Sequence, residues 1–541
     1  MKIRRHGTAR LVRLAALAFA CAAALAAAPA ITGVYNNSSF APPGLPNSGI
    51  AQGSIFAVKG SGLGPSTLLE VSGYPWPSTQ GLAGTTVQVT VGSVTKTCIM
   101  IYSWDLQVAA VLPSATPVGT GTLTLTYQGA KVSTSIQVVA ANFGSLTLNG
   151  GGTGPGVITD GSYNVITMVN PAHPGDTLVL WGTGLGAVTG DETVPPPQYD
   201  LGSGAQVFVG NQPATVWYGG RSNYPGVDQI NFTVPPGTAG GCKVSIAVVV
   251  KGVTGNVTTA SIAPVGQTTC SDTFGMLTSA NLQKAVAKGS LNVGGIGITR
   301  IGSVSDSLLA YFGNFPLNSI IRSNGGSYIP SAGSCTALEG EGSSPEAALV
   351  DPIEPTYLNA GPNLVVTGPG GSKTVPADST GYYSATLATP PSVYIAPGTY
   401  SVGNGSGGSG VGAFTAGLTL PAPVVPTSLP ASVNRAQNLT LNWTGSAGFH
   451  EVGVFAFNGV PVTFALNSYV FVLCNASASS GSFTIPSTFL NLLAPDGYGA
   501  TGQHGVNLQI VGIPESPFTA PGIDTGVLTV FTTNGSIATL K

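Results

Sequence analysis

The sequence predicts an all-β protein with several immunoglobulin-like β-sandwiches in tandem and one short linking helix. Its 541 residues include 77 glycines and 41 prolines, whereas charged residues make up only 7%. Threonine, serine, valine and asparagine are also abundant; β-branched residues favour strands, and glycine, asparagine and proline favour the turns between them. One segment of the sequence is duplicated, and the length allows several domains of about 100–200 residues. Both observations indicate domains in tandem.

The first thirty residues have the three-part form of a secretory signal. Five basic residues precede an apolar, alanine-rich stretch, and Ala-Pro-Ala at 28–30 offers small residues for cleavage. We therefore expect a mature protein that is secreted, periplasmic or associated with the cell surface, with no transmembrane segment. Removing five of the 18 basic residues leaves 13 against 20 acidic ones, a balance of −7. Nucleic acid is not an expected partner, because binding it relies on clustered lysine and arginine.

The hexapeptide GSGLGP at 60–65 returns as GTGLGA at 182–187, each time after a short apolar run. Gln107 and Pro113 likewise return as Gln229 and Pro235, 122 positions later. A phosphate-binding loop would need a helix directly after the glycines, but proline- and glycine-rich segments follow both copies. We interpret the hexapeptides as corners of a duplicated sandwich domain, where glycine adopts backbone conformations that other residues avoid.

These patterns resemble the IPT/TIG family of immunoglobulin-like domains, over roughly 45–142 and 165–266. The strand followed by G-x-G-L-G and the later V-P-x-G segment carry the resemblance. The whole chain is similar to an essentially uncharacterised group of exported bacterial proteins with two such modules and a β-rich C-terminal half. The resemblance implies tandem sandwiches and supplies no reaction.

We expect six segments along the chain. They are a signal peptide (1–30), two IPT/TIG-like sandwiches (31–142 and 143–268), a linker with a helix near 278–289 (269–289), an Ig-like β domain (290–423) and a fourth β domain (424–541).

Five cysteines remain after the signal, and an oxidising compartment favours disulfides. Cys242 and Cys270 bracket a strand–turn–strand segment, and we predict that they pair. Cys335 with Cys474 is a second, looser pairing. Cys98 is left over and is interpreted as a buried thiol on a core strand.

The sequence has few patterns of residues typical of catalytic or metal-binding sites. We therefore expect no enzyme activity, no cofactor and no metal site. His173, His450 and His504 lack the partners of a catalytic triad, and His450-Glu451 lacks the second histidine of a zinc-binding H-E-x-x-H motif. Carboxylate pairs could come from Asp191 or Glu192 with Asp200, or from the acidic segment 339–355, which is expected to be a loop. Calcium binding at 339–355 is left open.

An aromatic, glycine-rich segment is the candidate ligand-binding loop, formed by Trp217, Tyr218, Arg221 and Tyr224. Exposed aromatic rings beside an arginine suit a sugar ring or a protein partner. The alternative is that Trp217 fills the sandwich core.

The sequence therefore favours a non-catalytic extracellular or surface protein that binds a surface polysaccharide or a protein partner through loops at the sandwich ends. Two alternatives stay open. One is a secreted glycoside or ester hydrolase with carboxylates such as Asp351 and Glu354, and the other is a mechanical spacer without a ligand.

Overall fold

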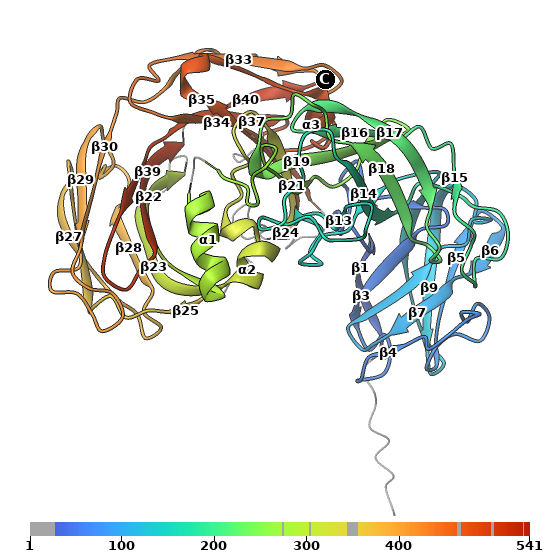
Figure 1. The fold of residues 1–541 in the computed structure, drawn as a ribbon. Helices are drawn as coiled ribbons and strands as arrows, with labels where there is room; N and C mark the ends of the chain where they lie inside the picture. The colour runs from blue at the N-terminus through green and yellow to red at the C-terminus, as the bar shows by residue number, and fades with distance from the viewer. Residues whose placement is uncertain are drawn as a thin grey trace, which may run out of the picture.

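The computed structural model describes residues 28–272, 275–301, 305–342, 355–461, 467–498, 503–533 and 535–541. The expected signal sequence therefore lies outside the described residues, except for positions 28–30. Within the described chain the fold is all-β and multi-domain, as predicted, and the sheets follow an arch from β4–β6 to β27–β29 (Figure 1). No helix in these residues combines the length and apolar character needed to cross a bilayer.

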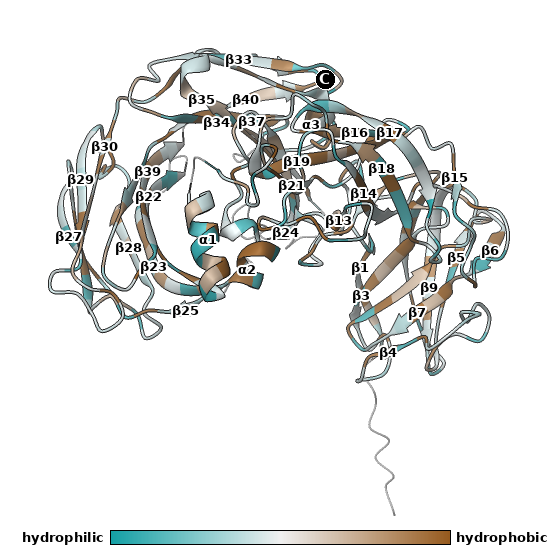
Figure 2. Cartoon of the chain, viewed as in Figure 1, coloured by the Kyte–Doolittle hydropathy of each residue, from teal (hydrophilic) through white to brown (hydrophobic). Residues whose placement is uncertain are grey.

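The first sandwich packs two five-stranded sheets face to face. Valines at alternate positions of β5 (Thr85–Val91) are buried against Phe56 and Val58 of β3. Hydrophobic and hydrophilic residues are interspersed along the strands of the whole fold (Figure 2). One sheet has the order β1 (Ala30–Asn36), β3 (Ile55–Ser61), β8 (Gln107–Val111), β7 (Ile99–Ser103) and β4 (Leu69–Glu70). The other has the order β2 (Ile50–Ala51), β10 (Ala130–Val139), β9 (Gly119–Tyr127), β5 and β6 (Val94–Thr97).

The second sandwich is one continuous eleven-stranded sheet folded around its own core. Its path is β11 (Gly144–Ser145), β14 (Thr177–Thr183), β18 (Asp228–Thr233), β17 (Gln212–Arg221), β16 (Gln206–Val209), β19 (Gly241–Val250), β21 (Thr258–Ile262) and β12 (Gly154–Pro155). Alongside lie β13 (Ile158–Thr159), β15 (Tyr199–Asp200) and β20 (Val253–Thr254). The bounds of β14 are those of β3 shifted by the repeat distance, which agrees with a duplicated unit.

Both glycine hexapeptides are corners that lead from a strand into a loop, and the next element is a short strand, not a helix. In each copy the corner's own N–H groups bind an aspartate of the same sandwich. Gly62 N donates to Asp105 Oδ1 at 3.0 Å, and Gly184 N and Leu185 N both donate to Asp228 Oδ2 at 2.8 Å. An internal carboxylate thus occupies the donors that a phosphate would need, and the interpretation as structural corners is confirmed.

Substitution of Gly184 by alanine is expected to cost more stability than the same change at Gly190. Both glycines have positive φ angles, 112° and 98°. Alanine at either position should therefore lower the free energy of unfolding by about 1–2 kcal/mol through backbone strain. A Cβ at Gly184 would also overlap the carbonyl oxygen of Asn142, whereas a Cβ at Gly190 meets nothing within 4 Å. Chemical denaturation should show a loss of about 2–5 kcal/mol for Gly184→Ala. Equal losses for the two variants would contradict this account.

The described residues of the C-terminal half form four further sheets. A six-stranded sheet has the order β25 (Thr356–Tyr357), β23 (Asp306–Pro316), β22 (Ser290–Ile301), β39 (Thr525–Thr533) and β38 (Glu515–Phe518), with β28 (Tyr383–Ala388) beside β23. It packs on a sheet of β27 (Gly371–Pro376), β26 (Asn363–Gly368), β29 (Gly398–Gly403) and β30 (Thr415–Leu420). The next sheet has β24 (Cys335–Gly342), β35 (Asn467–Ser477), β34 (Glu451–Pro461), β37 (Val506–Ile513), β40 (Gly535–Leu540) and β32 (Ser432–Val433). It packs on β31 (Val425–Ser428), β33 (Leu439–Thr444) and β36 (Ser482–Ile485).

These sheets exchange strands across the boundary expected near residue 424. Strand β39 pairs in parallel with β22, beginning with Val293 opposite Thr525, and β24 pairs with β35 over eight positions. Cutting the chain into 290–423 and 424–541 therefore does not separate the sheets, because each side contributes strands to the other. Local alternation shows that a strand exists, but it does not show which distant strand lies beside it.

The predicted helix is confirmed as α1 (Ser279–Lys288). The Thr278 side chain caps it by accepting from Asn281 N, and Leu282 and Ala285 face the core. Val286, four residues after Leu282, is exposed. Two shorter helices are α2 (Leu317–Arg322), which was not expected, and α3 (Ser487–Leu490).

Candidate functional site

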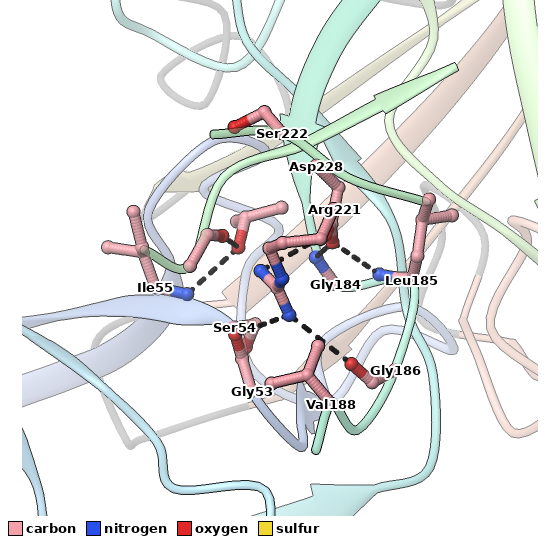
Figure 3. Close-up of polar contacts among 12 residues, drawn as sticks. Gly53, Ser54, Ile55, Gly184, Leu185, Gly186, Val188, Arg221, Ser222 and Asp228 are labelled. Carbon is pink, nitrogen blue, oxygen red and sulfur yellow. Dashed lines mark hydrogen bonds and ion pairs between the residues drawn. The ribbon is translucent and has the colours of Figure 1, made fainter. Parts of the chain in front are cut away.

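Arg221, expected in the ligand-binding loop, points inward at the junction of the first two sandwiches (Figure 3). Its side chain is 1% exposed, and Nη1 lies 3.0 Å from Asp228 Oδ1. Nη2 donates to the carbonyl oxygens of Gly53, in the first sandwich, and Gly186. The prediction that Arg221 belongs to a ligand site is therefore wrong, because its guanidinium forms buried contacts at the junction between the sandwiches.

Strand pairing places this ion pair. Arg221 at the end of β17 lies directly opposite Asp228 at the start of β18. Burial raises the pKa of Asp228, and the Arg221 guanidinium and the N–H groups of Leu185 and Gly184 oppose that shift. The carboxylate thus joins the guanidinium to the second glycine corner, and the guanidinium joins both to the first sandwich.

Three further contacts hold the same junction. Thr183 Oγ1 accepts from Ile55 N at 2.9 Å, Trp76 N donates to Thr193 O at 2.8 Å, and Ser114 Oγ donates to the Glu192 carboxylate at 2.7 Å. Glu192, one of the carboxylates considered for glycoside hydrolysis, is therefore engaged in structure. We call this set of contacts, together with Arg221 and Asp228, the interdomain joint.

Tyr224 also belongs to the interdomain joint. Its ring packs edge-on against Trp76 of the first sandwich, with centroids 5.2 Å apart, and Trp76 stacks on Tyr74 at 5.5 Å. Tyr224 keeps 43% of its surface exposed while Trp76 is buried. The four residues of the expected loop are thus divided between the joint and the sheet surface.

Trp217 lies on the sheet surface and does not fill the core. Trp217 follows the exposed Thr215 by two positions, so strand alternation turns it outward, where 68% of its surface is exposed. The pairing of β17 with β18 then shifts between Val216 and Tyr218, and this bulge brings Tyr218 to the same side. The indole N–H of Trp217 donates to Thr233 Oγ1 at 2.7 Å, which fixes the ring on the surface.

Neighbouring residues extend this surface across three strands. Opposed residues of paired strands point to one side of a sheet, and the pairs Trp181–Gln229 and Val179–Asn231–Tyr218 therefore share the side of Thr233 and Trp217. We call it the outer face of β14–β18–β17. It consists of Thr177, Val179, Trp181, Thr215, Trp217, Tyr218, Gln229, Asn231 and Thr233, none of which is charged.

A second tryptophan is fixed at the far edge of this outer face. Trp181 Nε1 donates to Thr159 Oγ1 at 3.1 Å, and the exposed ring of Tyr163 lies 6.1 Å from Trp181. Between the two tryptophans, Gln229 Nε2 donates to Asn231 Oδ1 at 3.2 Å. Only Trp217 and Tyr218 of this face were singled out from the sequence.

The acidic segment begins as a strand and not as the expected loop. Glu339 and Glu341 lie on β24; Glu339 Oε1 accepts from Asn47 and Glu341 Oε2 accepts from Tyr35, which ties the N-terminal segment to the C-terminal half. Burial raises the pKa of Glu339 to about 7. Residues 343–354, including Asp351 and Glu354, lie outside the described part of the chain.

Both predicted disulfides are present, Cys242–Cys270 and Cys335–Cys474. Cys98 is free and buried in the core of the first sandwich, and burial raises the pKa of its thiol, in agreement with its interpretation as an inert core residue. Among the described residues, no group of three or more histidine, cysteine, aspartate or glutamate side chains could hold a metal ion.

A cleft in the C-terminal half was missed from the sequence. Its volume is about 610 Å³, and His450, Glu451 and Glu515 are among its lining residues. In the sequence, His450-Glu451 was considered only as an incomplete zinc-binding motif, and no sequence pattern pointed to Glu515. Their proximity results from β34 and β37 being neighbours in one sheet, with Glu451 opposite Ile513.

No protein-family model and no curated protein matches the sequence. Among solved structures, the chain is similar to the extracellular region of plexin A4 (10% identity, 85% of this chain and 29% of that one, TM-score 0.16). Others are a tetra-tandem repeat of a large adhesion protein (12%, 95% and 100%, 0.13) and sidekick-1 immunoglobulin domains 1–5 (10%, 93% and 99%, 0.12). At TM-scores this low, the likeness carries no argument about function.

Proposed function

We propose that this chain is a non-catalytic extracellular or cell-surface protein that binds a neutral surface polysaccharide. Two disulfides support an oxidising compartment, and the proposed IPT/TIG-like identity of the first two sandwiches fits this location. The binding surface that we propose is the outer face of β14–β18–β17.

One observation carries the proposal: Trp217 is largely exposed, yet its ring orientation is fixed by the bond to Thr233. A fixed ring loses little conformational freedom on binding, and its apolar face suits the C–H face of a sugar ring. The partly exposed amide of Asn231 beside it supplies a directional hydrogen bond of the kind that sugar hydroxyls require. Because the outer face bears no charge, a neutral polymer fits it better than an acidic one.

Trp217→Ala is expected to weaken polysaccharide binding by about tenfold or more, because the exposed aromatic ring that would stack on the sugar is lost. Affinity electrophoresis and pull-down with insoluble cellulose, chitin and a panel of soluble neutral glycans would measure this. Tyr224→Ala is the matched control, because it removes an aromatic ring from the interdomain joint and not from the outer face. The Tyr224→Ala protein should bind the polysaccharide as tightly as wild type does. Equal binding by wild type and Trp217→Ala, or binding by neither to any polymer, would overturn the proposal.

A mechanical spacer without a ligand is the second candidate, and the interdomain joint favours it. Buried hydrogen bonds from Ile55 N to Thr183 and from Arg221 to Gly53 join the first two sandwiches and hold their relative orientation. Small-angle scattering should give one particle shape at all ionic strengths if the joint is rigid. That result together with no polymer binding would leave the spacer as the function.

A further inference from the structure

The cleft in the C-terminal half lies where three parts of the chain meet. Thr278 and Asn281 at the start of α1 form one wall, His450 and Glu451 at the start of β34 form a second, and β38 and β39 form a third. A smaller cavity of about 310 Å³ shares Gly275, Glu515 and Val527 with the cleft and continues it toward Lys243. Together they reach the size of cavities that hold small organic ligands.

Two of the described residues that line this cleft are acidic. Glu451 and Glu515 line it with two carboxylates, and Glu451 is buried and accepts from Asn475 Nδ2. Lys243 is buried on the far side, but its ammonium already lies 3.4 Å from Asp272 Oδ2. The lysine and Asp272 neutralise each other, so among the described residues that line the two cavities the carboxylates of Glu451 and Glu515 give the cleft an acidic character when Glu515 is ionised.

Glu515 is the second carboxylate of the cleft. Both of its carboxylate oxygens accept from Gly275 N, at 3.0 and 3.1 Å. Burial raises the pKa of Glu515 to about 7; the Glu451 charge adds to the shift, whereas the Gly275 N–H and Lys243 oppose it. A carboxylate in this position gains from any positive charge placed beside it.

The remaining surface of the cleft suits the apolar part of a ligand. Ile513, Pro517 and Val527 line the larger cavity, and Tyr311 lines the smaller one. Aliphatic side chains contact a hydrocarbon body, and an aromatic ring face also attracts a cation.

From this combination of a cavity, two carboxylates and an apolar wall, we propose that the cleft binds a small organic amine, with its ammonium group at Glu451 and Glu515 and its apolar body against Ile513 and Val527. This site is independent of the polysaccharide-binding face.

Isothermal titration with phenethylamine and with its neutral counterpart 2-phenylethanol tests the proposal on the full chain. At about pH 8 we expect the amine to bind about tenfold or more tightly than the alcohol, because only the amine meets the carboxylates. Equal affinities for the two probes, or no binding of either at up to about 10 mM, would overturn the proposal.

Two variants separate this site from general attraction of cations. Glu515→Gln should remove the preference for the amine, whereas Glu70→Gln, an exposed glutamate of the first sandwich, should keep it. Circular dichroism establishes that both are folded. Unchanged amine binding by a folded Glu515→Gln protein contradicts the proposal.

The pH dependence of wild-type binding gives a test that needs no Glu515 variant. With a pKa of about 7, Glu515 is ionised above neutrality and mostly neutral below it, so amine affinity should fall by about tenfold from pH 8 to pH 6. His450 also lines the cleft, and Glu451, Lys243 and Asp272 face Glu515 or its cavity. The His450→Gln variant should show the same decrease in amine affinity between pH 8 and pH 6. An affinity that does not change with pH in that variant would contradict the role of Glu515.

Discussion

Replacing Arg221 by alanine is expected to lower the free energy of unfolding by about 3–5 kcal/mol, because it leaves the fully buried carboxylate of Asp228 without its cation. The loss should appear in the transition of the first two sandwiches, since the guanidinium also bonds Gly53 of the first. Urea denaturation followed by tryptophan fluorescence would measure it. Arg322→Ala, at an exposed arginine of α2, is the control and should change stability by less than about 0.5 kcal/mol.

A double variant tests whether the buried charge causes this loss. Arg221→Met with Asp228→Asn removes both charges, and the amide oxygen of asparagine can still accept from Gly184 N and Leu185 N. We expect it to regain about 2 kcal/mol or more over Arg221→Ala, because no unpaired charge remains. If it is no more stable than the single variant, lost packing of the long side chain explains the effect and the ion-pair account fails.

Removing the Cys335–Cys474 disulfide is expected to cost about 5 kcal/mol, the second large effect. The bond spans 139 residues, and the chain-entropy model assigns a larger gain to a longer loop. Its two cysteines lie opposite each other on β24 and β35, so the bond also fixes the register of the sheet that joins distant parts of the chain. Thermal and urea denaturation of the Cys335→Ser, Cys474→Ser variant would measure the loss.

The Cys242–Cys270 bond offers the matched comparison within the same molecule. It spans 28 residues, so the same model gives about 3.5 kcal/mol for the corresponding double serine variant. The order of the two losses is the critical result. A larger loss for the shorter loop would show that local contacts, and not loop closure, set the value of these bonds.

Features encoded within short segments could be predicted from the sequence. The two glycine corners, α1 and the burial of Cys98 each follow from local pattern and composition. The Cys242–Cys270 pair followed from the strand–turn–strand segment between the two cysteines. Such features require little knowledge of which strands become neighbours.

The candidate sites depend on neighbours that the sequence does not reveal. Arg221 looked like a surface residue because glycines and aromatics surround it, yet its position opposite Asp228 in the sheet turns it into a buried residue. Trp217 and Tyr218 both lie on the outer face because strand pairing shifts between Val216 and Tyr218, whereas period-two alternation would place these neighbours on opposite faces. Glu451 and Glu515 meet at a cleft only after the strands of the C-terminal half are arranged.

The parallel pairing of β22 with β39 constrains the order in which a newly synthesised chain matures. Residues 290–301 leave the ribosome long before Thr525 does, so the middle of that sheet stays open during translation. A bare strand edge of this kind invites contact with other chains. Assistance from a chaperone, or delivery across a membrane in an unfolded form, would protect the nascent protein until its final strands arrive.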